Sequence, residues 1–167
     1  MRTTTQHIDA IIGVYVQDDR TFYVKRSPSM ENYPNAWSLL SIQFTLDELQ
    51  DFLDLPSAQR VMERMSQERL CGAPVHVVRY LKSARCSDNP MGVPVRLHLY
   101  EIELEEEPRL NPEYYIDSAW MTPEEYTVAS ANSTCGLCMR MWSDYCVENG
   151  LCETRFAPEV VEDEEED

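Results

Sequence analysis

The chain has 167 residues, enough for one domain with a sizeable core, and 43% of them are hydrophobic, which excludes a disordered chain. Its net charge of -16 predicts repulsion from nucleic acids and anionic membranes, although a small basic pocket could still bind a phosphate. No apolar run approaches the roughly 20 residues of a membrane span, and the N-terminus lacks the apolar stretch of a signal peptide, so we expect a cytoplasmic protein with reduced cysteines.

The C-terminal end differs in composition from the rest of the chain. The last ten residues, "PEVVEDEEED", contain seven acidic side chains and no basic ones. We therefore expect one folded domain over residues 1–157 and a disordered acidic tail over 158–167. A tail that docks on a specific partner is the alternative.

Alternating and periodic apolar residues predict the elements in chain order. Strands are expected over 7–17, 21–27, 38–44, 75–86, 93–104 and 116–121, and the first two are expected to form a hairpin around 18–20. Helices are expected from Thr45, over 57–70, at 122–126 and over 133–149. This order predicts a single mixed α/β domain with helices packed on the sheet.

Three of these helices carry start or stop signals. Thr45 with Glu48 fits a capping box, and Thr122 with Glu125 fits a second one, in which Pro123 takes the first helical position. Gly72 is the expected end of helix 57–70.

Three stretches, in this order, resemble the Nudix superfamily. An arginine precedes Pro-x-x-Trp and a strand in "VKRS" and "YPNAWSL" (24–27 and 33–39), helix 57–70 stands where the superfamily has its signature helix, and "PEYYIDSAWMTPEEY" (112–126) matches its closing strand and helix start. The resemblance covers about residues 7–145. It implies an α/β/α sandwich with a mixed sheet, and that a homodimer is possible.

The signature helix is degenerate in this chain. The superfamily carries R-E-U-x-E-E there, where U is aliphatic, and the counterpart is "RMSQER" (64–69). Arg64 takes the place of the arginine and Glu68 that of one glutamate, whereas Met65 and Arg69 replace the other two. The resemblance thus implies the fold with most of its metal-binding glutamates missing.

Diphosphate hydrolysis explains why these glutamates matter. Mg²⁺ or Mn²⁺ supplies the water nucleophile and neutralises the phosphates, and it needs several hard oxygen ligands. Glu68 by itself is a poor cage for such an ion, and it can instead pair with Arg64 on the helix surface. Met65 continues the apolar stripe of Ala58, Val61 and Met62, which predicts core packing.

Arg69 follows Met65 by one helical turn and so shares the inward stripe. A cation there needs a partner, and an ion pair with an acid such as Asp117, or a stem that reaches the surface, is one interpretation. The other is that its guanidinium stands where the metal would be and holds phosphate oxygens directly.

Further candidate ligand-binding residues precede this helix. Arg26 follows an apolar strand where the resemblance implies a phosphate contact, and a solvated arginine at a strand end is the alternative. Tyr33 and Trp37 are candidates for the wall of a base-sized pocket, whereas a core position is the alternative for Trp37. With Arg64 and Arg69 they complete the predicted ligand-binding set.

The cysteines of "CGLC" (135–138), with Cys146 and Cys152, are candidates for a metal site. Their spacing departs from that of zinc ribbons, and Cys138, Trp142 and Cys146 recur at core intervals. We expect thiols packed against Trp142 rather than zinc or a redox pair. The three histidines have no ligand spacing.

Two functions remain open. The first is binding of a nucleoside-diphosphate-linked or other small diphosphate ligand, with weak or no hydrolysis and no cofactor. The second is a Mg²⁺-dependent pyrophosphohydrolase with Glu68 as catalytic residue and relocated metal ligands, Glu68 and Glu113 first, with Glu48, Asp51 and Asp117 as further candidates. A third idea is an interaction protein that uses the fold as a scaffold.

Overall fold

The computed structural model describes residues 8–45, 54–87, 92–131 and 135–158. Two expectations fall outside these ranges. They are the helix that begins at Thr45, whose residues 46–53 are not among those described, and the acidic tail beyond Pro158.

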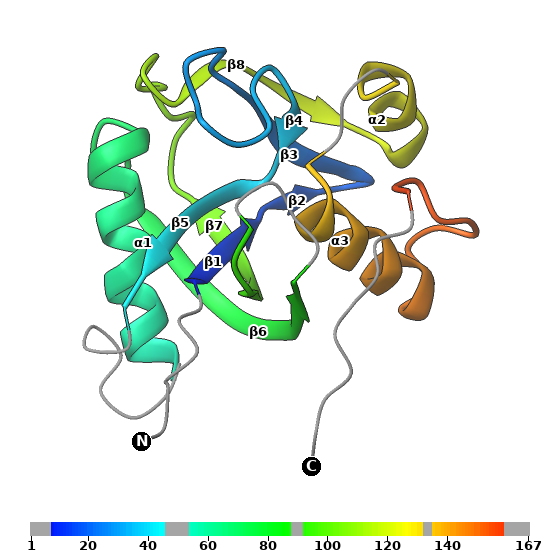
Figure 1. The fold of residues 1–167 in the computed structure, drawn as a ribbon, viewed down its shortest axis with the longest axis horizontal. Coiled ribbons are helices and arrows are strands. Elements are labelled where there is room, and N and C mark those ends of the chain that lie inside the picture. Colours follow the sequence, from blue (N-terminus) through cyan, green and yellow to red (C-terminus); the bar gives the residue numbers. More distant parts are fainter. Residues whose placement is uncertain (1–7, 46–53, 88–91, 132–134, 159–167) are drawn as a thin grey trace.

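The described chain contains eight strands and three helices (Figure 1). The strands are β1 (Ile8–Val14), β2 (Val16–Gln17), β3 (Arg20–Arg26), β4 (Trp37–Ser38), β5 (Leu40–Phe44), β6 (Val75–Cys86), β7 (Val95–Leu104) and β8 (Tyr115–Met121). The helices are α1 (Leu55–Arg69), α2 (Pro123–Ala129) and α3 (Leu137–Glu148). None of the described helices is long and apolar enough to span a membrane.

The strands form two four-stranded sheets. The first has the order β5-β1-β7-β6, and its β1–β7 pair is parallel while its other pairs are antiparallel. In the second sheet β3 pairs with β2, β4 and β8. The parallel pair confirms the expected mixed sheet.

Two hydrophobic clusters lie on opposite faces of the strands. Ile11 and Phe22 belong to the cluster under α1, whereas their neighbours Ile12 and Tyr23 belong to the cluster under α3. Successive strand residues point to opposite faces, so strands that are apolar at every position feed both clusters. Figure 1 shows α1 and α3 on opposite sides of the strands, which confirms the α/β/α sandwich.

The expected strand 7–17 is in fact two strands, so the predicted hairpin is wrong in part. The chain breaks at Tyr15, whose carbonyl accepts the Phe22 N–H at 2.9 Å. Only β2 forms the hairpin with β3, through a turn with Asp18 at φ 58°. β1 pairs with β5 and β7 instead, because its buried positions on both faces suit a central strand.

Helix α1 is fixed at its start, along its length and at its end. Asp54 caps the start by accepting the Ser57 N–H at 2.8 Å. Met65 is fully buried, as its apolar stripe predicted. The cap at the end is Leu70 rather than Gly72, which follows in the left-handed region with φ 82°. This end places Arg69 beside the sheets.

The last two helices differ in how well the sequence located them. The capping box of Thr122 and Glu125 is present in α2. Helix α3 begins after Gly136, later than expected, because Gly136 has φ 67° and ψ -124° and interrupts the helical backbone.

Candidate functional site

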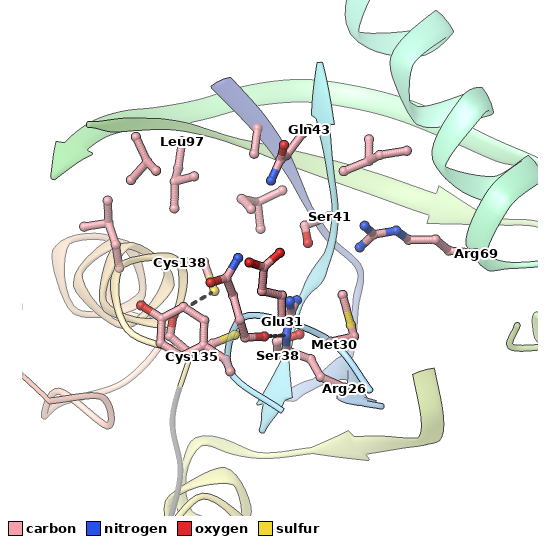
Figure 2. Close-up of a pocket in the computed structure, with 17 residues that line it drawn as sticks. Arg26, Met30, Glu31, Ser38, Ser41, Gln43, Arg69, Leu97, Cys135 and Cys138 are labelled. Carbon is pink, nitrogen blue, oxygen red and sulfur yellow. Dashed lines mark hydrogen bonds between the residues drawn. The ribbon is translucent and has the colours of Figure 1, made fainter. Parts of the chain in front are cut away.

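A cavity of about 270 Å³ opens between the first sheet, the loop 27–36 and the start of α3 (Figure 2). Its floor is apolar and comes from strands β1 and β7. Its polar groups come from the end of β3, the loop, β4, β5 and the end of α1. The lining residues are Ala10, Ile12, Arg26, Met30, Glu31, Asn32, Tyr33, Ser38, Ser41, Ile42, Gln43, Arg69, Val95, Leu97, Cys135, Leu137 and Cys138.

Arg26 brings a buried cation to this cavity from the end of β3. Its side chain is 9% exposed, and its Nε donates to the carbonyl of Asn32 at 2.9 Å. Its backbone N–H donates to the carbonyl of Ala36, so the loop is folded back on the arginine. Within the described ranges no carboxylate forms an ion pair with Arg26.

Arg69 is the second cation of the cavity. Its Nη1 donates to the Tyr115 hydroxyl at 3.1 Å, and its guanidinium carbon lies 4.6 Å from the ring centroid of Tyr114. Its Nε is buried without a hydrogen-bond partner in the described part of the chain. Among the described residues Arg69 forms no ion pair with Asp117, whose carboxylate accepts the Ser118 N–H instead.

Tyr33 belongs to the loop 27–36, and its side chain contacts the start of α3 at Gly136. A Cβ atom on Gly136 would be 2.7 Å from the Tyr33 hydroxyl, so this close approach requires glycine at position 136. Burial raises the pKa of Tyr33 to about 12, and the neighbouring thiols Cys135 and Cys138 add to the rise. Tyr33 is therefore a neutral hydrogen-bonding group at ordinary pH.

Several polar lining residues carried no functional prediction. Glu31 lies in the loop, where no pattern marks it, and its carboxylate points into the cavity in Figure 2. Ser41 and Gln43 alternate with core residues along β5, and this alternation is the signal that could have identified them.

The remaining predicted site residues lie outside the cavity lining. Trp37 is partly buried against the cluster under α3. Arg64 donates to the carbonyl of Gln43 at 2.6 Å and pairs with Glu68 at 3.6 Å. Glu113 is exposed, and its carbonyl accepts from a serine of the loop.

The donors on the α1 face do not match a Mg²⁺ cage. Met65 is fully buried, Arg69 is a cation, and Glu68 has a side chain 47% exposed that faces Arg64. No group of three His, Cys, Asp or Glu side chains in the described ranges is placed to hold a metal ion. Mg²⁺ prefers several oxygen ligands in octahedral geometry, and this face offers one carboxylate.

Solved structures identify the architecture. A NUDIX hydrolase from Nitrosomonas europaea matches with a TM-score of 0.65 and 13% identity over 86% of this chain and 90% of its own. The MutT protein from Methanosarcina mazei Go1 matches with a TM-score of 0.65 and 12% identity over 89% and 99%. The chain has a Nudix-like fold.

A third similar structure agrees with this assignment. The MutT NUDIX hydrolase from Burkholderia pseudomallei matches with a TM-score of 0.53 and 20% identity over 72% of this chain and 86% of its own. No family model and no curated protein sequence matches the chain. At such low identities the likeness extends to the Nudix-like fold, and the site must be argued from its own residues.

Proposed function

We propose that this protein binds a small molecule that contains a diphosphate group and that it does so without a metal ion. The observation that carries the proposal is the pair of arginines, Arg26 and Arg69, which line one cavity on a Nudix-like fold. Neither is neutralised by a carboxylate within the described ranges. Two guanidinium groups can hold phosphate oxygens by charge-assisted hydrogen bonds.

The rest of the cavity supports a ligand with one charged end and one less polar end. Ser38, Ser41 and Gln43 add neutral donors and acceptors to the wall. Ile12 and Leu97 supply apolar surface on the floor. Such a mixture of a few polar groups with an apolar lining is typical of small-molecule sites. It fits a nucleoside diphosphate or a related diphosphate ester.

Weak or absent hydrolysis follows from the same residues. Arginine stays protonated and holds no water as a metal does, so the arginine pair stabilises phosphate charge without generating a nucleophile. Glu68, the residue of the helix that could assist a metal, is paired with Arg64 outside the cavity lining. Binding without turnover is the expected result.

The test is a thermal-shift and calorimetric screen of nucleoside diphosphates, sugar nucleotides and inorganic pyrophosphate, with EDTA and with Mg²⁺. A ligand that binds the native state at a thousandfold excess over its Kd adds about 4 kcal/mol to the free energy of unfolding, and the melting temperature rises as a result. We expect stabilisation in EDTA. Stabilisation that requires Mg²⁺ would contradict metal-free binding.

The hydrolase alternative keeps one observation in its favour, the carboxylate of Glu31 inside the cavity. If Glu31 holds a metal or activates water, Mg²⁺ or Mn²⁺ should produce turnover that Glu31→Gln abolishes. Product analysis by chromatography of the same ligands separates this outcome from binding alone.

A further inference from the structure

Two thiols face each other in the wall of the cavity. Cys135 and Cys138 both line it, separated by only two residues of the chain. The Cys138 Sγ also lies 3.8 Å from the carbonyl of Cys135, the contact drawn as a dashed line in Figure 2. The Cys138 side chain thus folds back on the backbone of Cys135 in one cavity wall, and a disulfide requires two cysteines this close together.

The surroundings of this pair favour one thiolate. Cys135 directly precedes Gly136, the N-cap of α3, and within the described ranges no side chain caps the first N–H groups of this helix. The partial positive charge of such a helix start stabilises an anion. The hydrogen bond from Cys138, helped by the cation of Arg26 and the hydroxyl of Ser38, lowers the pKa of Cys135.

The partner thiol ionises less readily. The hydrogen bond to Cys135, together with burial, raises the pKa of Cys138 well above its usual range. Of the two thiols Cys135 therefore ionises more readily, which makes it the nucleophile and Cys138 the thiol that can respond to it.

Contrary to the expectation from the sequence, we propose that Cys135 and Cys138 form a redox site that hydrogen peroxide converts into a disulfide. The Cys135 thiolate attacks one peroxide oxygen, the O–O bond breaks, hydroxide leaves, and Cys135 becomes a sulfenic acid. The Cys138 sulfur then attacks the sulfur of Cys135, an S–S bond forms, and water leaves. Two thiols lose two electrons and two protons, and one peroxide becomes two waters.

Accessibility limits the oxidant to a small molecule. Cys135 is 5% and Cys138 is 8% exposed, and the cavity is the route by which solvent reaches them. Hydrogen peroxide is small enough to enter such a space, whereas a bulky disulfide is poorly suited to it. A disulfide formed here would stiffen the wall beside Arg26.

The chain contains a matched control pair. The Cys152 N–H donates to the carbonyl of Cys146 at 3.4 Å, and neither residue lines this cavity. Burial raises the pKa of Cys146, and it raises that of Cys152 as well. A second pair of nearby cysteines in which both pKa values are raised should oxidise much more slowly, because the thiolate is the reactive form.

The experiment uses the full chain with Cys71→Ser, since Cys71 is exposed and could cross-link two molecules. The folded protein is treated with dilute hydrogen peroxide, quenched with an alkylating reagent at timed intervals, and mapped by peptide mass spectrometry. We expect an early product that has lost two hydrogens, with the Cys135–Cys138 peptide disulfide-linked and the Cys146–Cys152 peptide alkylated. A dithiol reductant should restore the starting mass.

A second variant tests which cysteine reacts first. With Cys138→Ser the reaction should stop at a sulfenic acid on Cys135, which dimedone traps. Oxidation of Cys146–Cys152 before Cys135–Cys138, or no oxidation of either pair until the protein is unfolded in urea, would overturn the proposal. Neither result depends on which diphosphate the cavity binds.

Discussion

The guanidinium of Arg69 lies 4.6 Å from the ring centroid of Tyr114 while its Nη1 donates to the hydroxyl of Tyr115 at 3.1 Å. Two consecutive residues before and within β8 thus hold a cation that comes from the end of α1. Aromatic faces attract a cation without neutralising it. The arrangement fixes the direction of Arg69 and leaves its charge available to an anion in the cavity.

Replacing Arg69 by glutamine should weaken ligand binding. Loss of a charged hydrogen-bond donor costs about 1.5–3 kcal/mol, which is more than a tenfold rise in Kd. Calorimetry in EDTA measures it, and Arg79→Gln is the matched control because Arg79 is exposed, pairs with Glu101 and lies outside the cavity lining. Equal Kd values for both variants would show that Arg69 contributes nothing to the ligand.

Restoring the superfamily glutamate at position 65 should damage the fold rather than restore hydrolysis. Met65 is fully buried in the cluster under α1, so Met65→Glu places a carboxyl group in an apolar environment. We expect a loss of about 3 kcal/mol or more in the free energy of unfolding. Met65→Leu, which nearly conserves volume, should cost less than about 1.5 kcal/mol.

Urea unfolding followed by tryptophan fluorescence compares these two variants. If Met65→Glu is as stable as Met65→Leu and hydrolyses a diphosphate with Mg²⁺, the side chain reaches solvent. In that case the helix is only one substitution away from a metal site.

Alanine at Gly136 should be costlier than alanine at Gly150. Both glycines have positive φ, 67° and 72°, but a Cβ on Gly136 would be 2.7 Å from the Tyr33 hydroxyl, whereas a Cβ on Gly150 would meet no heavy atom within 4 Å. Gly150→Ala should cost about 1–2 kcal/mol for its backbone alone. Gly136→Ala should exceed this value and also weaken ligand binding, because Tyr33 must move.

A double variant identifies the cause. Tyr33→Phe removes the atom nearest to the new Cβ, so it should recover part of the stability that Gly136→Ala loses in a double-mutant cycle. Strict additivity of the two changes would place the whole cost in the backbone of Gly136.

The cap of α1 should titrate in acid. Hydrogen bonds from Ser57 hold the pKa of Asp54 below its usual value of 3.8. Because the folded-state pKa is the lower one, this stabilisation is fully present above the unfolded-state pKa and is lost as pH falls through the folded-state pKa. Asp54→Asn retains an acceptor oxygen but cannot titrate.

The free energy of unfolding, measured at several pH values from neutral to acid, tests this expectation. Below about pH 4 the wild-type protein should lose stability more steeply than Asp54→Asn. Parallel curves would mean that Asp54 has the same pKa in the folded and unfolded chain.

Local patterns in the sequence were enough for most elements. The inward stripe of α1 and the capping box of α2 were both predicted, because each depends on residues within one or two helical turns. The misplaced boundaries have causes of wider range. β1 ends at Val14 and is a separate strand from β2 because it pairs with β5 and with β7, which lies more than 80 residues later in the chain.

The candidate site divides in the same way. The sequence indicated Arg26, Tyr33 and Arg69, which the structure brings to one cavity, but also Trp37 and Arg64, which lie outside its lining. The resemblance of separate stretches can suggest individual residues. It contains no information on which of them meet.

What the sequence by itself determined is the α/β class, the fully buried Met65 and the replacement of glutamate by arginine at position 69. Only the tertiary structure decided that Arg69 rests on Tyr114 and that the thiols of Cys135 and Cys138 share a wall with Arg26. Periodicity is a property of neighbours along the chain, whereas a binding site is a property of neighbours in space. The parallel and antiparallel pairings that bring the ends of β3, α1 and α3 together are fixed by burial of the two clusters as a whole.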